Sequence, residues 1–243
     1  MSERTNHLTA SSPYKNLMKL RGFSCLSHAV IFITLLVVIT GCSGPLKQAS
    51  QFSKELYRTE QINDLRNSRI GFLTTAVAQG NGLGEYKSIL SDIIEKNFRE
   101  EQPEINILTS REILNRINSA DLAGEYAGMI AGYNLTGILE RKTLEKIGNV
   151  IEVKYIAQPR LSSFTERTST RLIAFGLSLI STRETSVNIS LQIWDTKTGS
   201  IVWEGSGQAT IAVEAMRAKP VSFEDVAEVA SRGLVKKFQP RNV

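Results

Sequence analysis

The order of residues before position 42 constrains the fold of this chain more than any other feature. Three basic residues, Lys15, Lys19 and Arg21, precede residues 29–39, a stretch that is apolar apart from one threonine. The stretch is about eleven residues long, whereas a membrane-spanning helix needs about 20. Basic, then apolar, then small residues is the order typical of a secretory signal, which is removed from the mature protein. We therefore predict that residues 1–41 form a signal peptide and lie outside the fold.

The end of this segment resembles the lipobox of bacterial lipoproteins. Its residues are Ile39, Thr40, Gly41 and Cys42, with small side chains directly before the cysteine. The resemblance implies that a diacylglyceryl group is attached to the thiol of Cys42 and that signal cleavage falls between Gly41 and Cys42. Ser43, in place of aspartate, resembles lipoproteins that are sent to the outer membrane.

We therefore expect a mature chain that is held by lipid at the periplasmic face of the outer membrane, so that a membrane is one of its partners. The alternative is an incidental cysteine at the end of a signal helix. Removal of residues 1–41 takes away four basic residues and Glu3, so the formal charge falls from +5 to about +2. A nucleic-acid partner would require a clustered basic face, and we expect none.

Histidine and cysteine usage excludes several classes of chemistry. His7, His28 and Cys25 all precede position 42, which leaves a mature chain with no histidine and with Cys42 as its only cysteine. Disulfides are then impossible, zinc loses its usual ligands, and Ser-His-Asp or Cys-His catalysis is excluded. We therefore expect no metal, no cofactor and no enzymatic activity. An enzyme would have to use carboxylates, a Ser-Lys pair or tyrosine.

The mature chain is predicted to consist of a tether, residues 42–68, and an α/β periplasmic domain, residues 69–239. The tether is polar, and its few large apolar residues have a loosely helical spacing, so a helix and a flexible spacer are both open. The domain is expected to begin with a short apolar strand at 70–77.

Strands and helices are expected to alternate in the first half of the domain. Apolar residues recur at three- and four-residue steps from Tyr86 to Phe98, which is typical of one face of a helix. A second strand is expected at 105–109, followed by a helix that Ser110 caps. Strand, helix, strand, helix is typical of an α/β unit.

The second half is expected to be richer in strands. A helix rich in alanine and glycine is predicted at 122–133, and strands are predicted at 135–141 and 150–156 on either side of a charged turn. Apolar and polar residues alternate over 187–193, which predicts a strand. A turn that contains glycine joins it to a hairpin partner at 201–203.

Apolar spacing from Phe223 to Leu234 predicts a C-terminal helix that is capped by Ser222 and Asp225. The sequence therefore predicts the α/β class: a single mixed-sheet domain, three-layer-like, with an N-terminal βαβα portion and a C-terminal antiparallel hairpin plus helix.

Segment 158–180 combines a polar half with an apolar half, and function is sought there first. One interpretation is a hairpin that packs against a neighbouring subunit or enters a membrane as part of an oligomeric barrel. The other, which we favour, is an ordinary buried strand preceded by a long loop. Function is sought here first because long loops on a rigid scaffold often carry it. The candidate interaction or oligomer residues are Arg160, Phe164, Arg167, Leu172, Phe175 and Leu177.

The layout resembles a group of bacterial envelope lipoproteins: the curli-secretion lipoprotein, the activator lipoproteins of penicillin-binding proteins and the exopolysaccharide-export lipoproteins. The resemblance implies a non-enzymatic protein that docks on or assembles envelope machinery. Its pore-forming branch implies two membrane hairpins per subunit, of which this sequence offers one candidate, 158–180. The resemblance is carried by Cys42, by 70–77 with its helix, by 187–195, and by Thr198, Gly199 and Trp203.

We therefore expect a membrane-anchored periplasmic lipoprotein that docks on or helps to assemble a secretion or cell-wall machine, with an envelope protein as partner. The alternative is a subunit of an oligomeric outer-membrane export channel or collar, which would form homo-oligomeric rings. A carboxylate-based enzyme acting on envelope glycans is a third hypothesis, for which the sequence offers no catalytic constellation.

Overall fold

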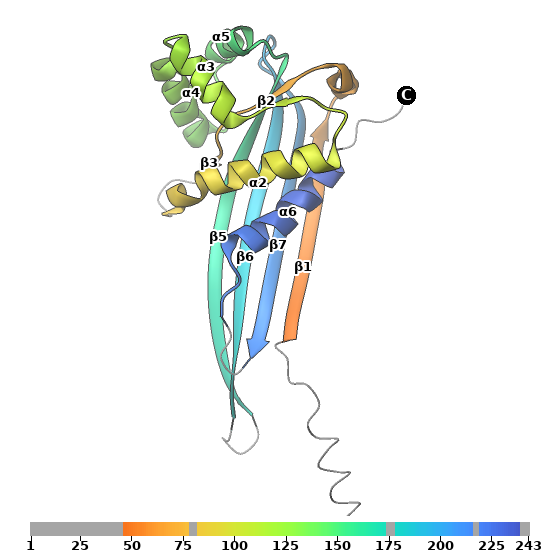
Figure 1. Ribbon diagram of the computed structural model, residues 1–243, viewed down its shortest axis with the longest axis vertical. Coiled ribbons are helices and arrows are strands. Elements are labelled where there is room, and N and C mark those ends of the chain that lie inside the picture. The colour runs from red at the N-terminus through yellow and green to blue at the C-terminus, as the bar shows by residue number, and fades with distance from the viewer. Residues whose placement is uncertain (1–45, 78–81, 174–177, 216–218, 239–243) are drawn as a thin grey trace, which may run out of the picture. The chain divides into compact units, whose positions relative to one another are not determined.

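A computed structural model describes residues 46–77, 82–173, 178–215 and 219–238, which belong to one compact unit. Their strands form a single mixed sheet in the order β1-β7-β6-β5-β2-β4, with β3 paired to β5 beside it (Figure 1). The strands are β1 (Leu46–Arg58), β2 (Ile70–Phe72), β3 (Ala76–Val77), β4 (Ile107–Leu108), β5 (Tyr155–Ile173), β6 (Ser178–Asp195) and β7 (Ile201–Ala215). The α-helices are α2 (Tyr86–Glu101), α3 (Ser110–Ser119), α4 (Ala123–Thr136), α5 (Arg141–Ile151) and α6 (Phe223–Lys237), and two short 3-10 helices are η2 (Glu60–Asn67) and η3 (Leu83–Glu85).

The predicted α/β class and single mixed sheet are confirmed. β2 runs parallel to β4 and β5, whereas β5, β6, β7 and β1 pair in antiparallel order. The expected βαβα portion, the hairpin of β6 and β7 and the C-terminal helix are all present. In the turn between β6 and β7, Gly199 has a φ of +68°, a left-handed conformation that glycine adopts without steric cost.

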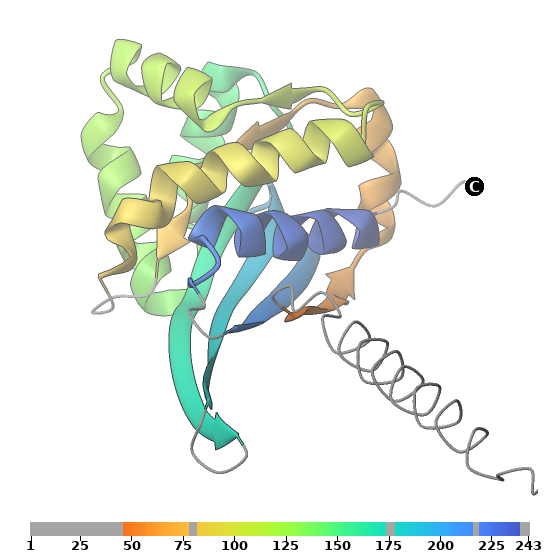
Figure 2. The same cartoon turned by 60° about the horizontal axis from the view of Figure 1, so that its bottom comes forward.

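Helices cover the two faces of the sheet to different extents. α2 and α6 lie side by side on one face and bury the larger core, to which the strands contribute Leu161, Ile189 and Ile211 (Figures 1 and 2). α3, α4 and α5 bury a second core on the opposite face, near Ile156 and Trp194. Of the helices described, none is both long enough and apolar enough to cross a membrane.

Local sequence explains the buried face of α2 and the start of α3. The predicted helix face of α2 is confirmed, since Leu90, Ile94 and Phe98 are fully buried. The cap of α3 is Thr109 rather than Ser110: its hydroxyl accepts from the Glu112 backbone N–H, while the Glu112 carboxylate accepts from the Thr109 N–H. This reciprocal pair is a capping box. Hydrogen bonds from Thr109 lower the pKa of Glu112.

The predicted tether is wrong for most of its length. Residues Leu46–Arg58 form β1, which pairs with β7 over its whole length, and Glu60–Asn67 form η2. Ile62 and Leu65 of η2 are buried in the larger core. The folded domain therefore begins before residue 69.

The predicted strands at 135–141 and 150–156 are also wrong in the main. Leu135 and Thr136 end α4, and residues 141–151 form α5, which begins after Glu140, whose carboxylate accepts from the backbone N–H groups of Lys142 and Thr143. Gly148 suggested a turn, but it is a packing residue: a Cβ there would lie 2.6 Å from the Cβ of Thr196. Only the last residues of the second segment enter a strand, because β5 begins at Tyr155.

Segment 158–180 contains no long polar loop among its described residues, so the interpretation that we favoured is wrong in this respect. Residues Tyr155–Ile173 form one continuous strand, β5, which pairs with β6 as an antiparallel hairpin. A bulge between Leu161 and Ser163 shifts the register once. The hairpin interpretation is thus confirmed for the backbone.

Replacing glycine by alanine should have opposite effects on stability at Gly207 and at Gly128. A Cβ at Gly207 in β7 would lie 2.6 Å from the carbonyl oxygen of Ala230 in α6, whereas a Cβ at Gly128 in α4 would meet nothing within 4 Å. We expect Gly207→Ala to lower the free energy of unfolding by about 1–3 kcal/mol through overpacking. Gly128→Ala should raise it by about 0.5–1 kcal/mol, because glycine is unfavourable within a helix. Urea denaturation of both variants tests this, and equal effects would contradict the close approach of α6 to β7.

Candidate interaction surface

The sheet has a face that the described helices leave uncovered. Along β6, Val187, Ile189 and Leu191 are buried under α6 and α2, so the alternate residues Ser186 and Ser190 point to the opposite side. On that side α3, α4 and α5 cover only one end of the sheet (Figures 1 and 2), where they pack on Ile156 and Trp194. We use the name open face for the part of this side of the sheet that these helices do not cover. Its rows, from β5 through β6 and β7 to β1, are Arg160-Ser190-Ser206-Lys54, Ser163-Asn188-Gln208-Phe52, Thr165-Ser186-Thr210-Ser50, Arg167-Glu184-Ala212-Gln48 and Ser169-Thr182-Glu214-Leu46.

Most of the open face is polar. The hydroxyls of Ser186 and Thr210 lie 2.8 Å apart, and the Arg171 guanidinium forms an ion pair with Glu214. Opposite Arg167 in the pairing register lies Glu184, so both signs of charge are present. Antiparallel sheets commonly have one solvated face of this kind. Polarity alone therefore does not mark a binding site.

Strand β1 is the part of this face that differs from an ordinary solvated sheet. It carries Leu46, Phe52, Leu56 and Tyr57, whose exposed fractions are 68%, 63%, 49% and 50%. These are half of the large exposed hydrophobic residues found in the described part of the chain. Single exposed apolar residues are normal, but a cluster of them indicates a contact surface.

β1 is also an edge strand, since it pairs with β7 on one side only among the described strands. A long edge presents unpaired backbone N–H and C=O groups that another chain can use. Lys47 and Lys54 lie on it, and lysine on an edge strand disfavours indiscriminate pairing. The edge is therefore suited to a specific partner rather than to aggregation.

The upper limit of the open face is a chain of polar side chains under α4. The Tyr133 hydroxyl donates to Oε1 of Gln192 at 3.0 Å, and Nε2 of Gln192 donates to Glu204 at 3.1 Å. Burial raises the pKa of Tyr133 to about 12, although the neighbouring Arg160 cation opposes the shift. The Arg160 guanidinium lies over the Tyr133 ring, 5.9 Å from its centroid. Tyr133 therefore stays protonated and acts as a donor at neutral pH.

The structure separates the residues that the sequence singled out. Arg160 is half-buried beside Tyr133, and Arg167 is exposed on the open face. Phe164 lies on the opposite side, where its ring centroid is 5.0 Å from that of Tyr86 and 5.3 Å from that of Phe223, so it is a packing residue. The backbone of Leu172 pairs with Leu179 near the end of β5.

The remaining predicted site residues, Gly41, Cys42, Phe175 and Leu177, lie outside the described residues. Sequence reasoning missed Phe52 and its neighbours in β1, because they were assigned to the tether. The signal that could have found them is a large aromatic residue in an otherwise polar segment.

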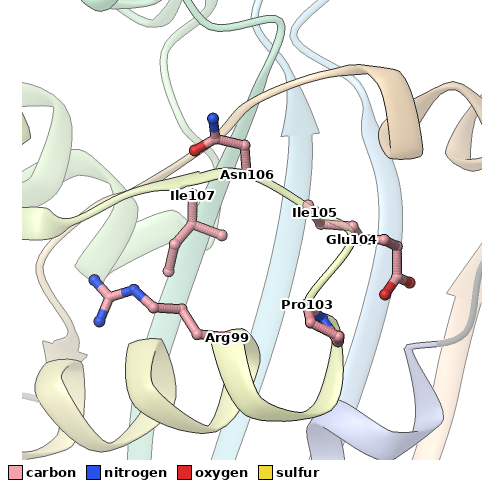
Figure 3. A pocket seen from close by; sticks show the side chains of 6 residues that line it. All are labelled: Arg99, Pro103, Glu104, Ile105, Asn106 and Ile107. Carbon is pink, nitrogen blue, oxygen red and sulfur yellow. The ribbon is translucent and has the colours of Figure 1, made fainter.

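A hollow of about 450 Å³ lies between the end of α2 and β4 (Figure 3). It is lined by one guanidinium, from Arg99, and one carboxylate, from Glu104, which point away from each other, together with Asn106 and apolar residues. Within the described part of the chain, no three His, Cys, Asp or Glu side chains are grouped as metal ligands. The absence of enzymatic activity stays a prediction.

Comparisons with known proteins give structural neighbours only. No family model matches this chain, and no curated protein matches it in sequence. The PelC dodecamer from Paraburkholderia phytofirmans is similar with a TM-score of 0.41 and 12% identity over 81% of this chain and 100% of that chain. Lipoprotein GNA1162 from Neisseria meningitidis gives 0.38 and 12% over 63% and 87%, and the LpoB C-terminal domain from Salmonella enterica gives 0.34 and 11% over 60% and 93%. Similarity at this level supports no inference about function.

Proposed function

We propose that this chain is a non-enzymatic, lipid-anchored protein at the periplasmic face of the outer membrane, where it docks through the open face on another protein of an envelope machine. The observation that carries the proposal is the cluster of exposed apolar residues along the edge strand β1. The signal pattern and the lipobox-like residues before Cys42 support the location.

The open face is not needed for the core of the domain. Val187, Ile189 and Leu191 fill the core from one side of β6, and the core does not require Phe52 or Leu46 on the other side. Exposed aromatic residues in a polar surround are typical of the central anchors of protein interfaces. The mixed charges of Arg167 and Glu184 suit a protein partner.

A photocrosslinking experiment in cells tests this docking role. The photoreactive residue p-benzoylphenylalanine is placed at Gln208, which is exposed and pairs directly with Phe52. We expect a discrete crosslinked product that Phe52→Asp abolishes, because a charge at the centre of the contact is unfavourable when desolvated. Leu135→Asp is the matched control, since Leu135 is 75% exposed and belongs to α4 rather than to the strands of the open face.

The product should persist in the Leu135→Asp variant. A product that survives Phe52→Asp, or no product at Gln208 in a protein with an unchanged circular dichroism spectrum, would contradict docking through this face.

A second candidate is an export collar built from copies of this chain, which the long edge of β1, bordered by no further strand among those described, favours. In this case the crosslinked product has twice the mass of the chain. Light scattering and negative-stain microscopy of the detergent-extracted, acylated protein distinguish the two candidates. Closed rings support the collar, and monomers support docking on a different protein.

A further inference from the structure

Strand β1 begins with a segment that is exposed on both of its faces. All seven residues from Leu46 to Phe52, which we call the β1 edge, are exposed, although β7 pairs with each of them. Ala49 lies on the side of α6, because its partner Ile211 is buried in the larger core, whereas Ser50 lies on the open face. The lower end of β1 extends beyond α6 (Figure 1). Among the described strands, none borders the outer side of this segment.

The backbone of the β1 edge already has the conformation that a further strand requires. Its pairing with β7 is regular, and the single register shift of β1 comes later, between Glu55 and Tyr57. In an antiparallel strand, alternate residues direct both backbone groups away from the paired neighbour, so about three or four residues of the β1 edge direct them outward. An extended segment of another chain can add to such an edge through main-chain hydrogen bonds. Most of the ordering cost then falls on the added segment, because β1 is already extended.

The side chains of the β1 edge indicate the chemistry of that segment. On the open face Leu46 and Phe52 are apolar and exposed. Lys47 lies on the α6 side, because its partner Val213 packs against the larger core. Within the described part of the chain, Lys47 belongs to none of the ion pairs. Directly opposite residues of paired strands share a face, so the fitting segment alternates apolar residues on one face with acidic or polar residues on the other.

A second copy of this chain fits the β1 edge less well. β1 contains three basic residues and one acidic residue, so two copies of β1 would bring like charges together. Among the described strands, the other long edge is β5 beyond Leu161, where residues 162–171 contain two arginines and one glutamate. Like charges on paired strands are destabilising. The charge of the β1 edge therefore favours an acidic segment from a different protein.

We propose that an extended segment of another envelope protein, with alternating apolar and acidic residues, adds to the β1 edge as a further strand of the sheet. The inference rests on the proposed function, since it specifies how the docked protein is held. It also explains why Lys47 and Lys54 lie on this edge: they oppose pairing with a basic strand and attract an acidic one.

Photocrosslinking on both faces of the β1 edge in cells tests the proposal. The photoreactive residue p-benzoylphenylalanine is placed at Ala49 or at Ser50, with Gln208 as the reference position on the open face. A protein that lies only on the open face reaches Ser50 but not Ala49. An added strand lies beside both, so we expect the same product at both positions. Mass spectrometry of the products from Gln48 and Ser50 should place the two crosslinks about two residues apart in one segment of the partner.

The variant Lys47→Glu tests the charge of the added segment. Because Lys47 is on the α6 side, docking on the open face alone does not involve it. We expect the yield of product at Ala49 and at Ser50 to fall by about threefold or more, because a cross-strand attraction becomes a repulsion. Lys142→Glu, at an exposed position of α5, is the matched control and should leave the yield unchanged. An unchanged yield in the Lys47→Glu variant overturns the acidic segment.

The remaining outcomes separate this inference from the function on which it rests. A product at Ser50 and Gln208 with none at Ala49 overturns strand addition and leaves docking on the open face intact. If none of the three positions gives a product in folded protein, the proposed function fails, and strand addition fails with it. A product at both positions that has twice the mass of the chain assigns the added strand to a second copy and overturns the choice of a different protein.

Discussion

Replacing Cys42 by serine should abolish the incorporation of fatty acid and leave an uncleaved precursor. In the proposed lipidation the acceptor is the sulfur of Cys42, and a serine hydroxyl is a far weaker nucleophile than a thiolate. Cleavage before residue 42 follows lipid attachment in the lipoproteins that the residues 39–42 resemble. The effect is therefore expected to be complete rather than partial. Metabolic labelling with a fatty-acid probe, together with the mobility of the chain on a denaturing gel, measures both results.

The sequence supplies a matched control for this experiment. Cys25→Ser removes the other cysteine of the chain, which lies inside the predicted signal peptide, and it should leave labelling and cleavage unchanged. Membrane fractionation is a poor readout, because an uncleaved precursor keeps the apolar stretch 29–39. Labelling that persists in the Cys42→Ser variant would show that the anchor is not at this residue.

Trp203→Ala should be the most destabilising substitution in the folded domain. Trp203 is fully buried, its ring lies 5.1 Å from that of Phe238, and its Nε1–H donates to Glu55 of β1 at 3.0 Å. Truncating a buried tryptophan costs about 3–5 kcal/mol. The whole free energy of unfolding of a domain is about 5–15 kcal/mol. We therefore expect a large fall in the urea concentration at the midpoint of unfolding. Far-ultraviolet circular dichroism measures this midpoint.

Two other variants serve as controls for Trp203→Ala. Trp203→Phe keeps an aromatic ring and loses the hydrogen bond to Glu55, which still pairs with Arg58, so the loss should be smaller. Leu114→Ala, at a position that is 39% exposed, should change the free energy of unfolding by no more than about 0.5 kcal/mol. If Trp203→Ala costs as little as Leu114→Ala, the contact between β7, β1 and the C-terminal helix is not as described.

The sequence predicts strands well where only one face is apolar. Over 187–193 the buried residues of β6 alternate with half-buried polar ones, and the prediction is confirmed. The same reasoning is confirmed for α2 and α6, whose apolar residues face one core. In each case one face of the helix or strand is buried, so apolar residues recur in the sequence at the spacing of that face.

β1 gives no such pattern because its side toward α6 is polar, while its large apolar residues are exposed. Gln51 faces α6 and donates from Nε2 to the carbonyl oxygen of Val229 at 2.7 Å, whereas Ser50 and Gln48 are exposed on the open face. The helix packs on this strand through polar contacts, so the alternation of the strand does not appear in hydropathy. The segment therefore resembled a solvated tether.

The candidate surface was predictable only in part, for the same reason. The polar half of segment 158–180 was interpreted as a loop, although residues 165–171 belong to a long strand and are exposed on both of its faces. Arg167 was selected and is exposed, but Phe164 was selected for an interaction and contributes to packing. Pairing between distant strands decides which side each residue faces, and a single sequence does not encode that register locally.

The pairing of β1 with β7 also limits how far the domain can move from its proposed lipid anchor. A free segment of the length of 42–68 would have an end-to-end distance of about 30 Å. Pairing from Leu46 onward leaves only residues 43–45 between a lipidated Cys42 and the sheet. The domain would then sample a thin layer next to the lipid, which raises its effective concentration toward proteins in the same membrane. A partner deeper in the periplasm would have to extend to the membrane to be bound.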